Sequence, residues 1–238
     1  LKYNDFDYEQ MAVLVRTASQ TRAFEECFIK EGIPYKVVGG LKFYERAEIR
    51  DMLAYFRLVL QPSDDLAFER IINKPARGIG EKTIDKFRNR AKADAIPLYQ
   101  AMVSMTSEGA FSGKTKNALE NFINLMTEWR RIMQAIPLGE FAETIVDESG
   151  YMAMLEQDKS VEAPGRIENI KELISVMSDE ENYPNLAEFL EHVSLVIDNE
   201  YNDNANKVIV STLHAAKGLE FDAVFLPGWD CLLYTSDA

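Results

Sequence analysis

The residues that follow Ser211 have the types and order needed to contact a nucleic-acid backbone. The segment reads Ser-Thr-Leu-His-Ala-Ala-Lys-Gly-Leu-Glu-Phe and ends at Phe221. Thr212 and His214 carry small hydrogen-bonding groups that suit a phosphodiester. On composition alone, the same residues could also form an ordinary polar loop.

Two further residues of this segment suit a nucleotide. Gly218 lets another group approach the backbone closely, and the carboxylate of Glu220 can accept a hydrogen bond from a ribose hydroxyl. The segment lies between two β-type runs, Val208–Val210 and Ala223–Leu226. Ligands in open α/β sheets bind beyond the carboxyl ends of strands, so this position favours a binding loop.

A second candidate site is the segment Asn-Lys-Pro-Ala-Arg-Gly-Ile-Gly, which ends at Gly80. A Gly-Ile-Gly turn that opens a helix presents backbone N–H groups and a positive helix end to a phosphate. Nearby side chains could add positive charge and a hydroxyl. The expected duplex-contacting residues are Arg77, Gly78, Ile79, Gly80, Lys82 and Thr83.

Charge is unevenly distributed along the 238 residues, whose net charge is −13. Residues 69–92 are locally basic, whereas residues 140–205 are strongly acidic. Such asymmetry would let one end of a domain meet phosphates despite the acidic total, although a solvated helix face would give the same pattern.

Composition narrows the class of protein. The two cysteines, Cys27 and Cys231, are far apart in sequence and predict neither a disulfide framework nor a metal cluster. Long apolar runs and a signal-like N-terminus are absent, which favours a cytoplasmic protein without a membrane partner.

The elements that would position these sites change in type along the chain. Met11–Val15 and Tyr35–Val38 are β-type runs, and a helix over 22–31 is expected between them, capped by Thr21 and stopped by Gly32. This order predicts an α/β layer with parallel pairing. After Gly40 the apolar period becomes helical for about 160 residues. The predicted helices cover residues 49–60, 66–72, 83–91, 116–132, 141–149, 167–177 and 186–197.

β-type runs return at Lys207–Thr212 and Ala223–Leu226. An α/β beginning and end around a helical middle is typical of one domain inserted into another. Trp129 lies at helical spacing with other apolar residues and is expected in the core, and His192 is expected to be a packing or surface residue.

The amino-acid sequences of these segments resemble those of UvrD/PcrA/Rep-type DNA helicases of superfamily 1. Thr-Leu-His-Ala-Ala-Lys-Gly-Leu-Glu-Phe followed by Val-Phe-Leu-Pro-Gly is similar to motif V of that family. The resemblance implies single-strand DNA contact for Thr212 and His214, and nucleotide contact for Gly218 and Glu220. It also implies duplex contact for the Gly-Ile-Gly turn.

Other segments resemble the same family in the same order. Residues 13–26 are similar to its L-Y-R-(S/T)-N-A-Q-S-R-x-x-E-E segment, which implies single-strand contact for Arg16 and Thr17. Here Val15 and Ala18 replace the usual Tyr and Asn, which puts one DNA contact in doubt. Residues 33–59 resemble a segment whose role is chiefly structural, and 165–173 resemble a helix start in which Asn169 and Glu172 are expected to tie helices together.

The resemblance implies an α/β plus all-α fold, in which a partial RecA-like, P-loop NTPase-type parallel-sheet domain is interrupted by a large helical insertion. Residues 1–38 and 207–230 would belong to the second RecA-like domain and 39–206 to the inserted domain, with Gly39-Gly40 as the hinge. ATP and Mg²⁺ would be bound mainly by an N-terminal RecA-like domain that these residues do not include. Because the chain has no G-x-x-x-x-G-K-(S/T) loop, we expect it to be inactive alone.

The last eight residues, 231–238, depart from the family. One codon choice for them resembles a transposon mosaic-end sequencing adapter, so we interpret them as read-through, with a divergent terminus as the alternative.

The implied function is ATP-dependent 3′-to-5′ movement on single-stranded DNA with duplex unwinding, in repair or replication. Single-stranded DNA and single-strand/duplex junctions would be the partners, with repair or replication proteins, in the bacterial cytoplasm near the nucleoid. Two alternatives stay open: the helicase subunit of a recombination helicase–nuclease, and a non-catalytic DNA-binding or interaction module.

Overall fold

The structure is a computed structural model that describes residues 6–40, 42–198 and 206–228. The chain divides into two compact units. The sheet unit is drawn from Leu1–Arg46 and Val193–Ala238, and the helical unit is Ala47–His192. The proposed read-through at 231–238 lies outside the described residues, as do Trp229 and Asp230.

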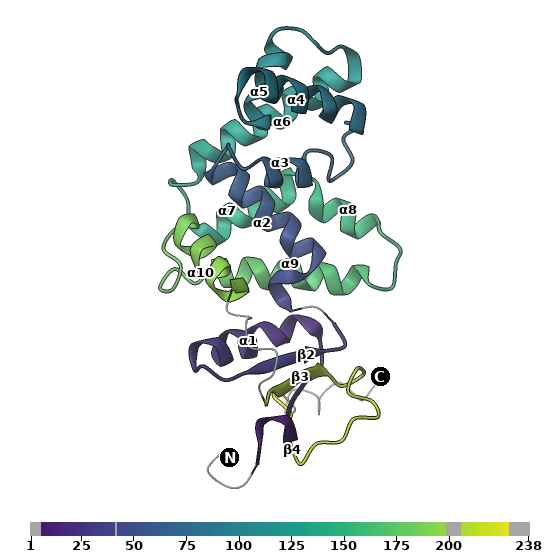
Figure 1. Ribbon diagram of the computed structural model, residues 1–238, viewed down its shortest axis with the longest axis vertical. Coiled ribbons are helices and arrows are strands. Elements are labelled where there is room, and N and C mark those ends of the chain that lie inside the picture. The colour runs from purple at the N-terminus through teal and green to yellow at the C-terminus, as the bar shows by residue number, and fades with distance from the viewer. Residues whose placement is uncertain (1–5, 41, 199–205, 229–238) are drawn as a thin grey trace. The chain divides into compact units, whose positions relative to one another are not determined.

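The sheet unit contains four parallel strands: β1 (Met11–Val15), β2 (Tyr35–Val38), β3 (Val208–Thr212) and β4 (Ala223–Phe225). Their order is β2-β3-β1-β4, so β3, from the end of the chain, lies between two strands from its beginning (Figure 1). The four runs predicted from sequence are confirmed as strands, and the expected parallel pairing is confirmed. Their apolar side chains form the core of this unit with Phe24, Phe28 and Ile33 of the α1 region.

Helix α1 (Thr21–Lys30) follows β1 through the short 3₁₀ turn η3 (Ala18–Gln20). The prediction that Thr21 caps this helix is wrong, because η3 moves the helix start and Gln20 occupies the cap position. The Thr21 hydroxyl instead contacts the Ala18 carbonyl at 2.9 Å and Glu25 at 2.6 Å. Gly32, at φ +63°, ends the helical segment as expected.

Residues 42–46 pack within the sheet unit and not in the helical one. The backbone N–H of Phe43, in the 3₁₀ turn η4 (Phe43–Glu45), donates to the buried Glu25 carboxylate at 3.2 Å. Arg46 donates to the Ala18 carbonyl at 2.8 Å and to the Thr21 hydroxyl at 2.9 Å. The compact sheet unit therefore extends to Arg46, eight residues beyond the end of β2.

The helical unit is built around α2 (Ala47–Leu60), which is buried on nearly all sides. It packs against α3 (Asp65–Ile71), α6 (Gly113–Ile132), α7 (Leu138–Glu148) and α9 (Ala163–Met177) (Figure 1). The remaining elements are α4 (Glu81–Asp94), α5 (Leu98–Ser107), α8 (Tyr151–Gln157) and the first part of α10 (Leu186–Asp198). The seven predicted helices are present, whereas α5 and α8 are additional to them.

The expectations that Trp129 lies in the core and that Asn169 ties helices together are confirmed. Trp129 is fully buried, and its indole N–H donates to Glu148 at 2.7 Å. Asn169 is buried on α9 and donates to Glu48 of α2 at 2.6 Å, so it ties two helices together. His192 is partly exposed and lies 5.2 Å from the Tyr183 ring, centroid to centroid, which fits a packing role.

Candidate nucleic-acid interface

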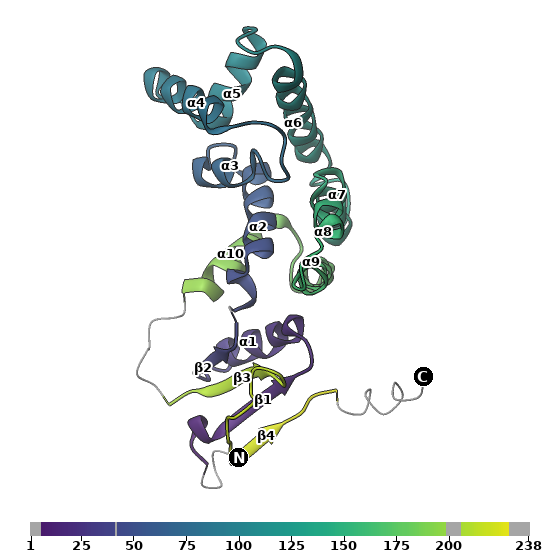
Figure 2. The same cartoon turned by 90° about the vertical axis from the view of Figure 1, so that its right-hand side faces the viewer.

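The carboxyl ends of β1 and β3 bring together the four residues expected to contact single-stranded DNA. The strands are parallel neighbours, with Val15 opposite Thr212 (Figure 2). Arg16 and Thr17 follow β1, while Thr212 ends β3 and His214 comes two residues later. Because parallel strands end at the same edge of a sheet, residues far apart in sequence emerge side by side.

Local hydrogen bonds fix the backbone of this edge. The Gln20 side-chain oxygen accepts from the backbone N–H of Arg16 at 3.0 Å and of Thr17 at 3.2 Å. The N–H of Leu213 donates to the Val15 carbonyl at 3.0 Å, which joins the two strand ends. Gln20 is a positioning residue whose capping role the sequence interpretation missed, although Thr-x-x-Gln is a capping-box pattern.

The side chains at this edge suit a phosphodiester. Arg16 and His214 are exposed, and Thr17 and Thr212 are half-buried. The Thr212 hydroxyl accepts from the Ala215 N–H at 3.3 Å, which leaves its own proton available for an external acceptor. A cation, an imidazole and two hydroxyls at one strand edge could together bind a phosphate-bearing chain.

The loop after β3 carries its later residues away from this edge. Asp222 donates its backbone N–H to the Gln10 carbonyl at 3.0 Å and accepts from the Gln10 side chain at 2.7 Å. Gln10 directly precedes β1, so the loop runs from the carboxyl end of β1 to its amino end. Glu220 is exposed and lies two residues before Asp222. The loop therefore leads from the carboxyl end of β1, near His214, toward its amino end, which it reaches two residues after Glu220.

Gly218 lies in the same loop with φ +88°, a conformation that side chains rarely adopt. It is exposed, and a β-carbon added there would meet nothing within 4 Å. Gly218 is therefore required by the turn itself, and the space above it is open to another molecule.

The Gly-Ile-Gly segment of the helical unit forms an ordered turn that opens α4. The Asn73 side-chain oxygen accepts from the N–H of Arg77 at 2.7 Å and of Ile79 at 3.2 Å. Ile79 is fully buried and anchors the turn, with Gly78 at φ +72° before it and Gly80 as the N-cap of α4. A β-carbon on Gly78 or on Gly80 would meet nothing within 4 Å, so the turn has open space outside it.

The side chain of Arg77 differs from the sequence expectation, which made it a phosphate ligand. Its guanidinium is directed into the helical unit, where it donates to the Ile71 carbonyl at 2.9 Å and to the Tyr55 hydroxyl at 2.5 Å. It also lies 5.1 Å from the centre of the Phe122 ring. The physical reason is that carbonyls at the end of α3 need donors, and the arginine fork can supply several at once.

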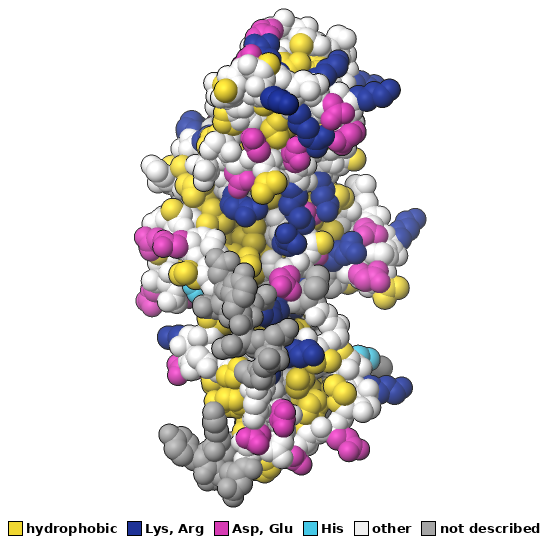
Figure 3. Space-filling model, viewed as in Figure 1, with side chains coloured by type: hydrophobic (Ala, Val, Ile, Leu, Met, Phe, Trp, Pro, Cys, Tyr) yellow, Lys and Arg dark blue, Asp and Glu magenta, His cyan; other side chains and the backbone are white. Residues whose placement is uncertain are grey.

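The other basic residues of 69–92 are largely paired with acids. Arg88 contacts Glu69 and Glu81 at 2.6 and 2.5 Å, and Arg90 contacts Glu108 at 2.8 Å. Figure 3 shows Lys and Arg side chains interspersed with Asp and Glu over the helical unit. Lys82 and Thr83 lie in the first turn of α4, and within residues 47–192, all of which are described, Lys82 forms no ion pair. The local basic excess therefore contributes fewer free cations than its count suggests.

Among the described residues, no group of three or more His, Cys, Asp and Glu side chains is placed to hold a metal ion. Over the same residues, no helix combines the length and the apolarity needed to cross a membrane.

Residues 1–231 match the UvrD-like helicase C-terminal domain. A protein named DNA helicase II from Rickettsia typhi is 44% identical over 223 residues, which are 92% of this chain and 33% of that protein. The ATP-dependent DNA helicase PcrA of Staphylococcus aureus is 38% identical over 239 residues, covering 97% of this chain and 32% of that protein. The chain thus spans about a third of these relatives. Because the family model matches almost the whole chain, the chain belongs to the UvrD-like helicase C-terminal domain family.

Proposed function

We propose that this chain is part of an ATP-dependent DNA helicase that moves 3′ to 5′ along single-stranded DNA and separates the strands of a duplex. The observation that carries the proposal is the convergence of Arg16, Thr17, Thr212 and His214 at the carboxyl edge of β1 and β3. A cation and small donors on neighbouring strand ends bind a backbone without reading bases, which a translocating protein requires. The names of the relatives, DNA helicase II and PcrA, agree with it.

In this proposal, residues 1–38 and 207–230 belong to the second of two RecA-like domains, and 39–206 form a domain inserted into it, whose first residues, up to Arg46, still pack with the sheet unit. The discontinuous sheet supports this division, because β1 and β2 come from one end of the chain and β3 and β4 from the other. The N-terminal RecA-like domain would supply most of the ATP and Mg²⁺ site.

The loop after β3, residues 213–222, is called the motif V loop here because its sequence resembles that motif. It would contact only part of an ATP molecule. Gly218 has open space beside a fixed backbone, and the exposed Glu220 carboxylate can accept from a ribose hydroxyl. A phosphate-binding loop would have to come from the other domain. When bound, ATP supplies the free energy for movement, and this loop would connect its ribose to the strand contacts at Thr212 and His214.

The turn from Gly78 to Gly80, with Lys82 and Thr83, is proposed to hold the duplex ahead of the junction. Free N–H groups at the start of α4 and one unpaired lysine favour a backbone phosphate over a base.

The test uses the full-length protein that contains this chain. DNA-dependent ATP hydrolysis and unwinding would be measured on duplexes with a 3′ or a 5′ single-strand tail, and only the 3′ tail should support unwinding. The 238-residue chain alone should show no turnover. Unwinding from the 5′ tail alone, or ATP hydrolysis by the pure 238-residue chain, would contradict the proposal.

A further inference from the structure

We propose that Tyr55 and Arg77 are positioning residues that hold the Gly-Ile-Gly turn in the shape that receives a duplex phosphate. In this proposal Arg77 acts through the turn and does not touch DNA. The inference rests on the proposed duplex contact by Gly78, Gly80 and Lys82.

Tyr55 joins the two ends of residues 74–77, the segment that leads into the Gly-Ile-Gly turn, through one hydroxyl group. It is fully buried on α2, and its hydroxyl donates to the Lys74 carbonyl at 2.6 Å while accepting from Arg77 at 2.5 Å. A hydroxyl has one proton to give and lone pairs to accept with, so both bonds can exist together. Burial raises the pKa of Tyr55, which keeps that proton in place at neutral pH.

Arg77, the residue directly before Gly78, is held by further contacts of its side chain. Besides Tyr55, its guanidinium donates to carbonyls at the end of α3, at Pro75 and at Ser149, at 2.9–3.4 Å. Moving Arg77 outward to a phosphate would leave these partly buried carbonyls and the Tyr55 hydroxyl without their donor. Leaving such groups unsatisfied is costly, so the inward position is the favoured one.

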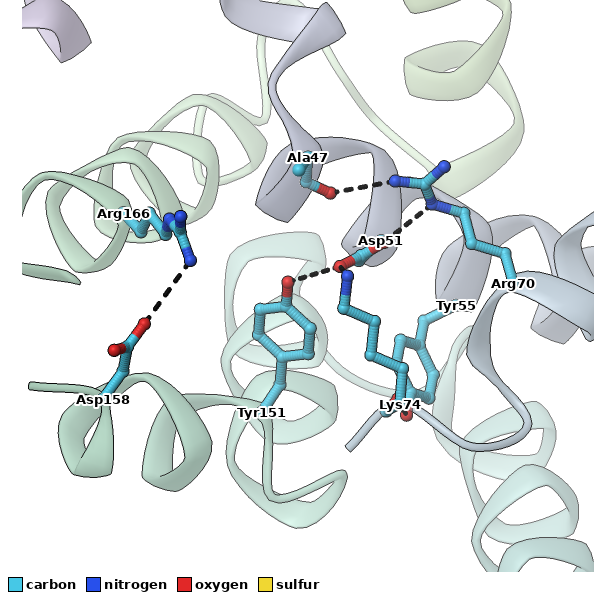
Figure 4. Close-up of polar contacts among 8 residues, drawn as sticks. All are labelled: Ala47, Asp51, Tyr55, Arg70, Lys74, Tyr151, Asp158 and Arg166. Atoms are coloured by element: carbon cyan, nitrogen blue, oxygen red, sulfur yellow. Dashed lines mark hydrogen bonds and ion pairs between the residues drawn. The ribbon is translucent and has the colours of Figure 1, made fainter. Parts of the chain in front are cut away.

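Asp51, one helical turn before Tyr55 on α2, stabilises the same region through its carboxylate. Figure 4 shows it between Arg70, Lys74 and Tyr151. Its buried carboxylate pairs with Arg70 at 2.7 Å and with Lys74 at 2.6 Å, and it accepts from the Tyr151 hydroxyl at 2.6 Å. On α2, Asp51 therefore contacts the ammonium group of Lys74, and Tyr55 contacts its carbonyl. Together they fix the position of Lys74, from which the chain leads into the turn.

A positioning role and a ligand role predict different salt dependence. Each neutralised duplex phosphate contributes about −0.9 to the slope of log affinity against log salt. Loss of a phosphate ligand flattens this slope, whereas a change in turn geometry that removes no charge lowers affinity at every salt concentration.

The experiment measures junction and single-strand binding of the full-length protein across a salt series, with thermal unfolding as a check on folding. Tyr55→Phe removes only the hydroxyl, and Arg77→Lys keeps the charge but loses the fork. Both should weaken junction binding by about three- to tenfold with an unchanged slope and unchanged single-strand binding. The matched control is Tyr99→Phe, because Tyr99 is a buried tyrosine whose hydroxyl accepts from Arg130 at 3.1 Å. It should bind the junction as the wild type does.

The outcomes separate this inference from the function on which it rests. If Lys82→Ala flattens the slope while Tyr55→Phe and Arg77→Lys both match the Tyr99→Phe control, the positioning role is wrong and the duplex contact stands. A flattened slope for Arg77→Ala together with full activity of Arg77→Lys would make Arg77 a phosphate ligand and overturn the inference. If neither Lys82→Ala nor Gly80→Val affects junction binding, the proposed duplex contact itself fails.

Discussion

Gly39 lies directly against Ala215, so that a β-carbon on Gly39 would sit 2.2 Å from that of Ala215. Gly39 directly follows β2, and Ala215 follows His214 in the motif V loop. The contact between them therefore sets how closely the loop can approach the sheet. Gly39 also has φ +85°, which disfavours any side chain.

Gly39→Ala should therefore lower the free energy of unfolding by about 2–4 kcal/mol, through strain and a forced shift of Ala215. Gly40→Ala is the matched control, because a β-carbon there meets nothing within 4 Å and the φ of Gly40 is not positive. The control should stay within about 0.5 kcal/mol of the wild type in urea unfolding. Equal losses for both variants would mean that the contact with Ala215 is unimportant.

His214→Ala and Glu220→Ala should have opposite effects in the full-length protein, since the loop carries these residues toward opposite ends of β1. His214→Ala should weaken single-strand DNA binding by up to about tenfold, the value of one hydrogen bond, with a smaller effect on ATP binding. Glu220→Ala should do the reverse, because a carboxylate repels phosphates but accepts from a ribose hydroxyl. Fluorescence anisotropy with labelled DNA and with a nucleotide analogue measures the two affinities, and the same defect in both would refute the division of the loop.

Lys82→Ala should flatten the salt dependence of junction binding by about 0.9 in slope, while single-strand binding is unchanged. Lys92→Ala is its control, since Lys92 is an exposed lysine ten residues further along α4, ~15 Å away along the helix axis. Gly80→Val should reduce junction affinity without changing the slope, because its side chain would occupy the open space outside the turn. If Lys82→Ala and Lys92→Ala changed this slope by the same amount, the Lys82 ammonium group would be solvated and would not contact a duplex phosphate.

Glu25 should give the sheet unit a measurable pH dependence. Burial raises the pKa of its carboxyl, opposed by hydrogen bonds from Thr21 and Phe43 and by the charge of Arg46. The folded state therefore keeps this proton to a higher pH than the unfolded state does, and the contribution of Glu25 to stability falls as pH rises between the ordinary and the raised pKa. The free energy of unfolding is measured for Glu25→Gln and for the wild type from about pH 4 to about pH 8. The difference, variant minus wild type, should increase as pH increases. A constant or falling difference would contradict the raised pKa.

Much of the fold could be predicted from the sequence because its long elements have clear periods. α2 carries apolar residues at helical spacing, and the strand runs are β-branched and bounded by turn residues. α8 was missed because it is only seven residues long and buries Tyr151 and Leu155 alone, too few positions to establish a period. Thr21 was misplaced because the sequence offers two threonines as possible caps, and the capping box of Thr17 and Gln20, which marks the 3₁₀ turn η3, was overlooked.

For the candidate sites, the sequence predicted a set of residues, and the structure adds where their side chains point. Motif V and the residues after β1 indicated which side chains should meet DNA, and the parallel register brings them to one edge. The inward direction of Arg77 depends on Tyr55, 22 residues earlier, and on Ser149, 72 residues later. Spacing along the chain carries no trace of such contacts, so an arginine beside a Gly-Ile-Gly turn was interpreted as a phosphate ligand.

The position of β3 between β1 and β2 also sets an order of events during synthesis on the ribosome. Ala12 pairs with Ile209, so β1 must wait for almost 200 further residues before its neighbour exists. The helical unit is continuous in sequence and can fold as soon as it emerges, since its contacts are closer along the chain. Until residue 209 has been made, the apolar side chains of Met11, Val13 and Val15 lack the β3 neighbour against which they are buried, so this segment exposes apolar surface for longer than any helix of the helical unit does.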